Sequence, residues 1–274
     1  MPGLSFSPPS WYIFSVNRSS HFRGLLLGFI CSGLSIPVQA ANDGVWEKVA
    51  STHFVVMHTG DTKLAQTISD HAETYYTEIA GDLGYTRYQK FWVWDNRVKI
   101  LIYPTAEAFA TACHAPAWAA GRASAERHEI ASYRQSGDSF LNALLPHEMS
   151  HLILGDFIGL EHIPLWLNEG FAQWEQVRHP ATPIPFPYRP VPLKTLMTMD
   201  IRQDHDRQRV ALFYAQSASL VGFLINTRGG ERFGAFCRGL RDGKAFEAAL
   251  AAAYPDDIQT QDGLEQKWLK SLLP

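Results

Sequence analysis

Six prolines fall within thirteen residues in the second half of this 274-residue chain. Proline has no backbone N–H and a fixed φ, so neither a helix nor a central strand can run through residues 180–192. We therefore predict an extended connector between an N-terminal unit of residues 41–179 and a C-terminal unit of residues 193–274. The six are Pro180, Pro183, Pro185, Pro187, Pro190 and Pro192.

The first forty residues have the layout of a secretory signal peptide. Arg18 and Arg23 precede a 13-residue apolar run over residues 24–36, and small side chains occupy the −3 and −1 positions of a cut after Ala40. The run is shorter than the roughly 20 residues that span a bilayer, and no other stretch is predicted to cross one. We expect a periplasmic or secreted protein with no stable membrane insertion after cleavage. The alternative is an anchor formed by an uncleaved segment.

The remaining composition is that of a folded, acidic protein. Apolar residues make up 46% and charged residues 19%, which excludes a disordered chain. Removing residues 1–40 takes away two of the 24 basic residues and none of the 27 acidic ones, so the net charge becomes 22 − 27 = −5. This balance excludes nucleic acid as the main partner. Eleven histidines against three cysteines favour imidazole chemistry over thiolate chemistry.

Strand patterns come before helix patterns along the chain, which favours an α+β fold over a regular βαβ array. Extended segments are predicted over 46–58, 98–103 and 129–133. Helical spacing of apolar residues predicts helices over 62–83, 106–113, 140–154, 164–177, 210–226, 232–240, 245–253 and 264–272.

The segment His147-Glu148-Met149-Ser150-His151 fits the pattern H-E-x-x-H. On a helix the two histidines lie one turn apart on one face, so both imidazoles can reach one metal ion. Glu148 lies beside them and can contact a metal-bound water without binding the metal. Pro146 should either kink this helix or start a new helical segment, and the i, i+4 geometry survives in both cases.

The next predicted helix carries Asn168-Glu169-Gly170, with Glu169 eighteen positions after His151. Two antiparallel helices joined by a short loop would bring this carboxylate to the histidine pair. Two histidines, one glutamate and an open fourth position form a catalytic zinc set rather than a closed structural one. The expected cofactor is one Zn²⁺ ion, held by His147, His151 and Glu169.

With these two motifs the chain resembles the gluzincin metallopeptidases. The segment of residues 166–172 is similar to the second motif of the M1 aminopeptidases, and the small peptidase MA-like members are a better match over roughly residues 45–272. No Gly-x-Met-Glu-Asn string is present, so the amine recognition of the M1 aminopeptidases is not carried over.

The resemblance implies a zincin-like catalytic domain with a small N-terminal sheet, a zinc-binding helix pair and a mostly helical C-terminal half. It implies that Glu148 is the general base and then the proton donor to the leaving amine. It also implies that Tyr214 hydrogen-bonds the oxyanion, with His205 as the alternative donor and a plain core role for Tyr214 as the other reading.

Several roles stay open at this stage. Asn168 either orients a zinc ligand or faces solvent. Cys113 and Cys237 are either bridged or two buried free thiols. Residues 127–134 are expected to form an edge strand beside the cleft, to which a peptide could add by main-chain pairing.

The sequence favours a zinc-dependent peptidase acting on a peptide or protein substrate. The main alternative is an exported zinc-binding or envelope-assembly module with little turnover. A weaker alternative is hydrolysis of a non-peptide amide.

Overall fold

The computed structural model describes residues 45–84, 92–116, 119–135, 137–178, 189–202 and 204–272. The proposed signal peptide and residues 180–188 of the proline connector lie outside these ranges, so the signal and the connector boundary stay predictions. The chain is α+β, as predicted, with a five-stranded sheet followed by a mostly helical half.

The sheet contains β1 (Glu47–Ala50), β2 (Phe54–His58), β3 (Val98–Tyr103), β4 (Gly121–Ser124) and β5 (Glu129–Tyr133). Its order is β1-β2-β3-β5-β4, with β2, β3 and β5 parallel and the two outer strands antiparallel. The expected edge strand at 127–134 is therefore wrong. Residues 129–133 form the interior strand β5, because β4 pairs along its outer side.

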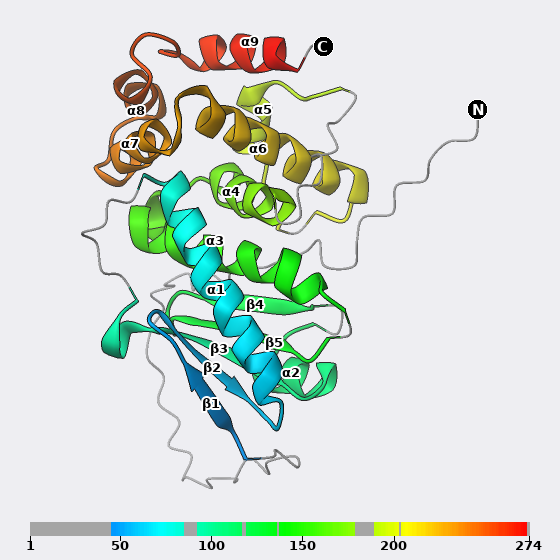
Figure 1. Ribbon diagram of the computed structural model, residues 1–274. Helices are drawn as coiled ribbons and strands as arrows, with labels where there is room; N and C mark the ends of the chain where they lie inside the picture. The colour runs from blue at the N-terminus through cyan, green and yellow to red at the C-terminus, as the bar shows by residue number, and fades with distance from the viewer. Residues whose placement is uncertain are drawn as a thin grey trace, which may run out of the picture.

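Helices cover both faces of the sheet (Figure 1). Helix α1 (Thr62–Asp82) begins where the Asp61 side chain accepts a hydrogen bond from the backbone N–H of Leu64 at 3.0 Å, a standard N-cap. Its apolar stripe packs on β1 and β2. On the opposite face, α2 (Ala106–Cys113) packs Phe109 and Cys113 against Ala131.

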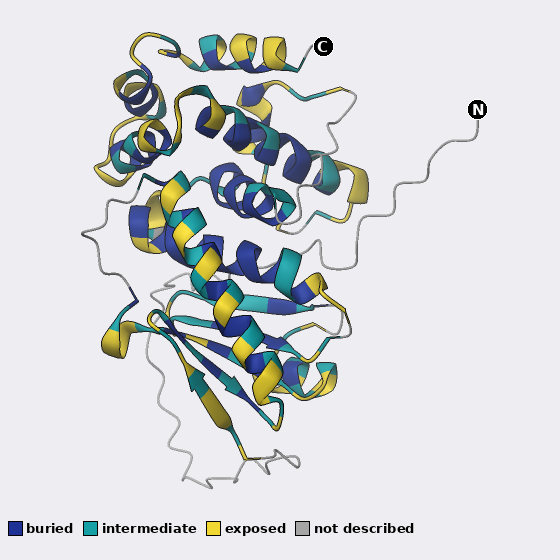
Figure 2. Cartoon of the chain, in the orientation of Figure 1, coloured by how far each residue is buried: buried dark blue, intermediate teal, exposed yellow. Residues whose placement is uncertain are grey.

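Helix α3 (Leu145–Ile158) lies between the sheet and the helical half, and α4 (Leu165–Arg178), α6 (Arg207–Arg228) and α9 (Gln261–Ser271) follow in successive layers (Figure 1). The remaining helices are α5 (Leu193–Thr198), α7 (Gly230–Arg241) and α8 (Phe246–Ala253). Short helical turns cover Trp94–Asn96 and Leu160–His162. Helices α3 and α4 are the most completely buried of the layers (Figure 2).

The chain changes its helical form just before Pro146 rather than starting a new helix there. Residues Phe140–Leu144 make a π-helical turn that runs directly into α3 at Leu145, with helical backbone angles across the junction and the proline in the first α-helical turn. Proline is tolerated there because the first N–H groups of a helix have no intrahelical partner.

Of the two alternatives for the cysteines, the structure shows the second: Cys113 and Cys237 are both buried free thiols, on α2 and α7.

Helix α6 is long and apolar enough to cross a membrane by length and composition, which the sequence analysis did not predict. Most of its apolar window is buried inside the protein, as in the core helix of a soluble fold, and its largest contact is with α4.

Candidate metal centre

The histidine pair lies on the buried face of α3. His147 and His151 are 1% and 8% exposed, and their Nε2 atoms face each other at 3.2 Å. Their rings are close to perpendicular, at 83°. The spacing of one helical turn that the motif predicts therefore brings two ring nitrogens to one point.

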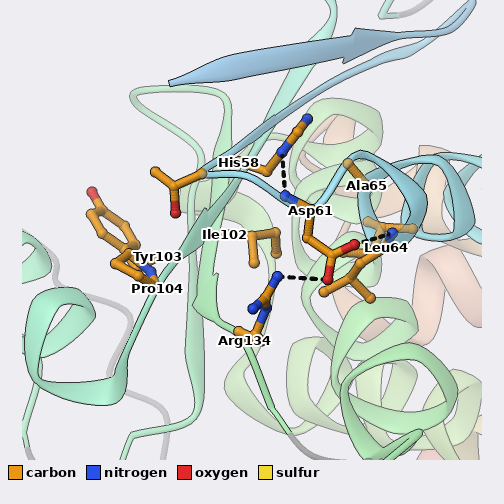
Figure 3. Close-up of a pocket in the computed structure, with 10 residues that line it drawn as sticks. His58, Asp61, Leu64, Ala65, Ile102, Tyr103, Pro104 and Arg134 are labelled. Carbon is orange, nitrogen blue, oxygen red and sulfur yellow. Dashed lines mark hydrogen bonds and ion pairs between the residues drawn. The ribbon is translucent and has the colours of Figure 1, made fainter. Parts of the chain in front are cut away.

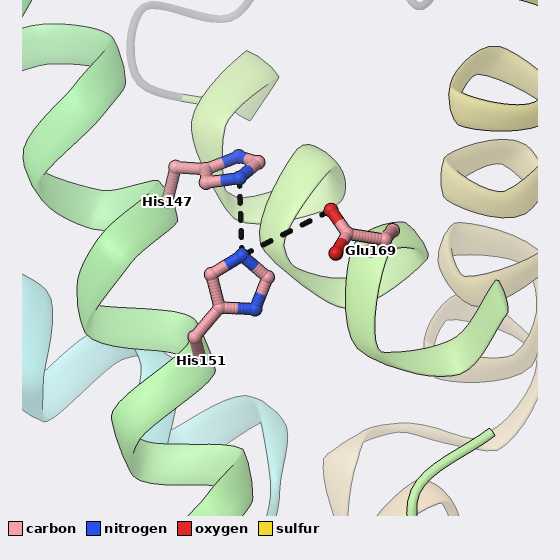
Figure 4. Close-up of side chains that lie close together, drawn as sticks. All are labelled: His147, His151 and Glu169. Atoms are coloured by element: carbon pink, nitrogen blue, oxygen red, sulfur yellow. Dashed lines mark hydrogen bonds and ion pairs between the residues drawn. The ribbon is translucent and has the colours of Figure 1, made fainter. Parts of the chain in front are cut away.

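Helix α4 supplies the carboxylate. The carbonyl of Pro164 accepts hydrogen bonds from the N–H groups of Leu167 and Asn168, which starts the helix just after the short connection. Oε2 of Glu169 lies 3.9 Å from Nε2 of His151 (Figure 4). One donor atom from each of the three residues lies within 4.8 Å of the other two, the only such group among the described residues.

Gly170 allows α4 to reach this position. A Cβ at residue 170 would lie 2.7 Å from the backbone oxygen of Ser217 on α6. Any side chain at residue 170 would force α4 and α6 apart. The glycine after Glu169 therefore allows the close helix packing that positions the Glu169 carboxylate.

Two polar side chains contact the ligand set. Oδ1 of Asn168 lies 3.0 Å from Nδ1 of His151, so it accepts the Nδ1–H of the neutral tautomer and leaves Nε2 as a lone pair. The Tyr214 hydroxyl, on α6 and 2% exposed, donates a hydrogen bond to the Glu169 carboxylate; burial raises the pKa of that carboxyl, and His151 and Tyr214 oppose the rise. Of the two readings of Asn168, orientation of a histidine is the one observed.

Burial dominates the electrostatics of the centre. It lowers the pKa of His147 well below the usual histidine value, and the neighbouring His151 lowers it further. It raises the pKa of Glu169. Burial, with a smaller contribution from the Glu169 charge, raises the pKa of Glu148 to about 7, against opposing effects of His151 and the Ala123 N–H. Burial thus favours the neutral His147 imidazole, the form that binds a cation, and makes an ionised Glu169 carboxylate unfavourable unless a cation lies beside it.

The spacing of the two imidazoles fits a tetrahedral zinc ion, and the Glu169 carboxylate lies farther off, at 3.9 Å from Nε2 of His151. Zn–N bonds of 2.0–2.1 Å at tetrahedral angles place two ligand nitrogens about 3.3 Å apart, close to the 3.2 Å found. Oε2 of Glu169 is buried and has no hydrogen-bond partner among the described residues, and the same is true of Oε1 of Glu148. An unpartnered buried carboxylate oxygen aimed at two imidazoles is stable only with a cation or a proton beside it.

Glu148, the candidate base, lies next to the edge strand β4. The sequence analysis did not predict this strand. Glu148 is 2% exposed, and the backbone N–H of Ala123 donates to its carboxylate. The partner is a main-chain group, so no side-chain pattern could have indicated it. Gln176, buried on α4, is a second neighbour that was missed; burial lowers the pKa of His147, and the Gln176 side chain opposes that effect. Only its position two turns after Glu169 hinted at it.

His205, the alternative oxyanion donor, is exposed before α6, whereas Tyr214 contacts a member of the ligand set. The small pocket in Figure 3 is separate from this centre, because none of the residues that line it belongs to the ligand set. Its polar groups are used structurally: Asp61 caps α1 and pairs with Arg134 at 2.6 Å, and Nδ1 of His58 accepts the Asp61 N–H.

The family model of the Peptidase MA superfamily matches residues 93–273, which is 181 of the 274 residues and includes α3 and α4. No curated protein matches the chain. The match covers more than half of the chain, and the chain therefore belongs to the Peptidase MA superfamily.

Proposed function

We propose that this protein is a zinc-dependent peptidase of the gluzincin type. The observation that carries the proposal is the convergence of two imidazole nitrogens and one carboxylate oxygen from adjacent buried helices. Membership of the Peptidase MA superfamily is consistent with peptidase chemistry. In this proposal His147, His151 and Glu169 hold one Zn²⁺ ion.

A bound zinc ion supplies Lewis acidity, which lowers the pKa of a water ligand to about 7 and polarises a carbonyl group. Two neutral histidines and one carboxylate leave the centre with a net positive charge when zinc is bound.

Glu148 has the properties of a general base at neutral pH. Its pKa of about 7 lets it accept a proton from the attacking water and return that proton to the leaving amine. The Ala123 N–H fixes one side of the carboxylate, and Oε1 stays available to the reacting groups.

Tyr214 is the proposed oxyanion donor. Its hydroxyl is buried and lies against Glu169, so it reaches the centre from α6, on the side away from the sheet. A donor fixed in a water-poor site stabilises developing negative charge strongly.

We also propose that the peptide lies along β4, rather than along residues 127–134. Within the described sheet β4 pairs with β5 alone, and it packs against α3 beside Glu148. Main-chain pairing to this strand would hold an extended peptide next to the base. N-methylation of alternate amides in a bound peptide should abolish binding, and methylation of the intervening amides should not; equal effects at all positions would reject this mode.

The deciding experiment compares the wild type with Glu148→Gln. Zinc content is measured by elemental analysis, and hydrolysis is measured on casein and on a mixed peptide pool. The variant should keep one zinc per chain and lose hydrolysis by about 10²–10⁴-fold. The matched control is Glu161→Gln, an exposed glutamate in the turn between the two helices, which should match the wild type in both measurements.

Two results would reject the proposal. Hydrolysis that persists in the zinc-loaded Glu148→Gln variant contradicts the role of the base. A wild-type protein that binds zinc but cleaves no polypeptide favours the alternative, an exported zinc-binding or envelope-assembly module.

A further inference from the structure

The turn between β4 and β5 ends in a residue whose backbone conformation is uncommon for its side chain. The N–H of His128 donates to the carbonyl of Ala125 at 3.2 Å, which closes a four-residue turn. His128 has a φ of 52°, in the left-handed region that glycine occupies without steric cost. A bulky side chain at such a position indicates that the ring serves a purpose outside the turn.

The His128 ring contacts helix α3. Its Nε2 lies 3.1 Å from Oδ2 of Asp156, in the last turn of that helix. The same ring stands edge-on to the buried Trp92 ring, with the ring centroids 5.4 Å apart and an angle of 86° between the planes. The turn after β4 therefore cannot move away from α3 without breaking the contact with Asp156.

Strand β4 meets the same helix at a second point. A Cβ at Gly121, the first residue of β4, would lie 2.8 Å from Cδ2 of Leu144, directly before α3. Leu144 and Asp156 are about 18 Å apart along a helix axis at 1.5 Å per residue. The strand and its turn thus run along α3 (Figure 1). Glu148 lies on the helix between these two points.

An edge strand that pairs with a peptide has to be held in place. Strand β4 is four residues long and has no β-branched or aromatic residue, so its own residues favour a strand only weakly. Within the described sheet it pairs with β5 alone. Fixing such a strand before the peptide arrives lowers the ordering cost of binding.

We infer that His128 is a positioning residue: through Asp156 it holds the end of β4 against α3 and so fixes the proposed peptide-binding edge beside Glu148. The inference rests on the proposed function for the peptide, and on the contacts above for the strand. Removing the ring should loosen β4, so that a peptide binds more weakly while the metal centre and the base keep their places. KM should therefore rise with little change in kcat.

The first test compares His128→Asn with His128→Gln by hydrogen–deuterium exchange, with circular dichroism to report the fold. Asparagine tolerates the left-handed backbone, but its amide is too short to reach Asp156, whereas glutamine places an amide N–H at about the position of Nε2. Exchange of the β4 amides should become about 5–10-fold faster in His128→Asn and stay within about twofold of the wild type in His128→Gln. Glu126→Ala, at an exposed position in the same turn, is the control and should match the wild type.

Steady-state kinetics on a peptide that the wild type cleaves gives the second readout. KM should rise about 5–10-fold in His128→Asn while kcat stays within about twofold, and His128→Gln should restore the wild-type KM. A role in general stability alone would speed exchange throughout the chain, α6 included, and would leave the KM of the folded protein unchanged.

Three results would overturn the inference. The first is wild-type exchange in β4 of a native-like His128→Asn protein, and the second is faster exchange with an unchanged KM. If His128→Asn does not fold, His128→Gly fits the left-handed backbone without the ring and should show the same local loss; unchanged β4 exchange in that variant is the third. A wild type that hydrolyses no peptide defeats the proposed function, and exchange in β4 then still decides whether His128 holds the strand.

Discussion

The indole N–H of Trp92 donates a 2.6 Å hydrogen bond to Oδ2 of Asp156, five residues after His151 on α3. Nε2 of His128 lies 3.1 Å from the same oxygen. Trp92 and His128 have φ values of 59° and 52°, which few non-glycine residues adopt. One carboxylate therefore holds two strained loops, before β3 and before β5, against the helix that carries both histidines.

Replacing Asp156 with Ala should destabilise the protein by about 1–3 kcal/mol, because the buried Trp92 N–H would lose its acceptor. Urea unfolding measures the change in free energy. Asp95→Ala, at an exposed position in the turn before β3, is the control and should shift it by less than about 0.5 kcal/mol. Equal effects of the two variants would mean that the link does not stabilise the fold.

Replacing Tyr214 with Phe removes the hydroxyl beside Glu169 and keeps the ring in the core. If the hydroxyl stabilises an oxyanion, kcat should fall about 10²–10³-fold while zinc stays at one per chain. Steady-state kinetics on a cleaved peptide, with elemental analysis of the same sample, gives both values. An unchanged kcat would assign Tyr214 to the core.

Glu175 predicts a pH dependence of stability. It is fully buried on α4, and burial together with the nearby Asp82 and Glu78 charges raises its pKa well above 4.5, against the attraction of Arg178. Above about pH 5 the folded chain holds a proton that the unfolded chain has lost, so the free energy of unfolding falls as pH rises towards the folded pKa.

Glu175→Gln should remove this contribution. Its free energy of unfolding, measured in urea at intervals from pH 5 to 8, should fall less steeply than that of the wild type, by up to about 1.4 kcal/mol per pH unit for one proton. Parallel pH profiles for the two proteins would show that Glu175 does not hold the proton.

Two glycine-to-alanine changes should have opposite signs. Gly170→Ala forces a Cβ against the backbone of Ser217 and should cost about 1–3 kcal/mol while displacing Glu169, so zinc affinity should fall as well. Gly81→Ala, on the open side of α1 with nothing within 4 Å of the new Cβ, should stabilise by about 0.5–1 kcal/mol. Thermal unfolding and zinc competition measure both variants; a neutral Gly170→Ala would mean that α4 and α6 can separate freely.

The helices that carry the candidate site could be predicted because their signals are local. The spacing of His147 and His151 and the apolar periodicity around Glu169 depend only on neighbours in the chain. The predicted helices 164–177 and 245–253 differ from α4 and α8 by one residue at most at either end.

What was missed depends on tertiary contacts. Strand β4 has the sequence Gly-Arg-Ala-Ser, with no β-branched or aromatic residue, and forms because it pairs with β5. For the same reason the interior position of β5 could not be predicted from its own residues. Helix α5 is six residues long and directly follows Pro192, so it gave no periodic pattern.

The π-helical turn before Leu145 has a consequence for how this centre tolerates change in chain length. A π turn contains one residue more than the α-helical turn that it replaces, and Pro146 donates nothing to the turn before it. A deletion within residues 140–144 can therefore be taken up by converting that turn to an α-helical one. Both histidines would keep their orientation towards α4, so this turn can lose one residue without moving the centre.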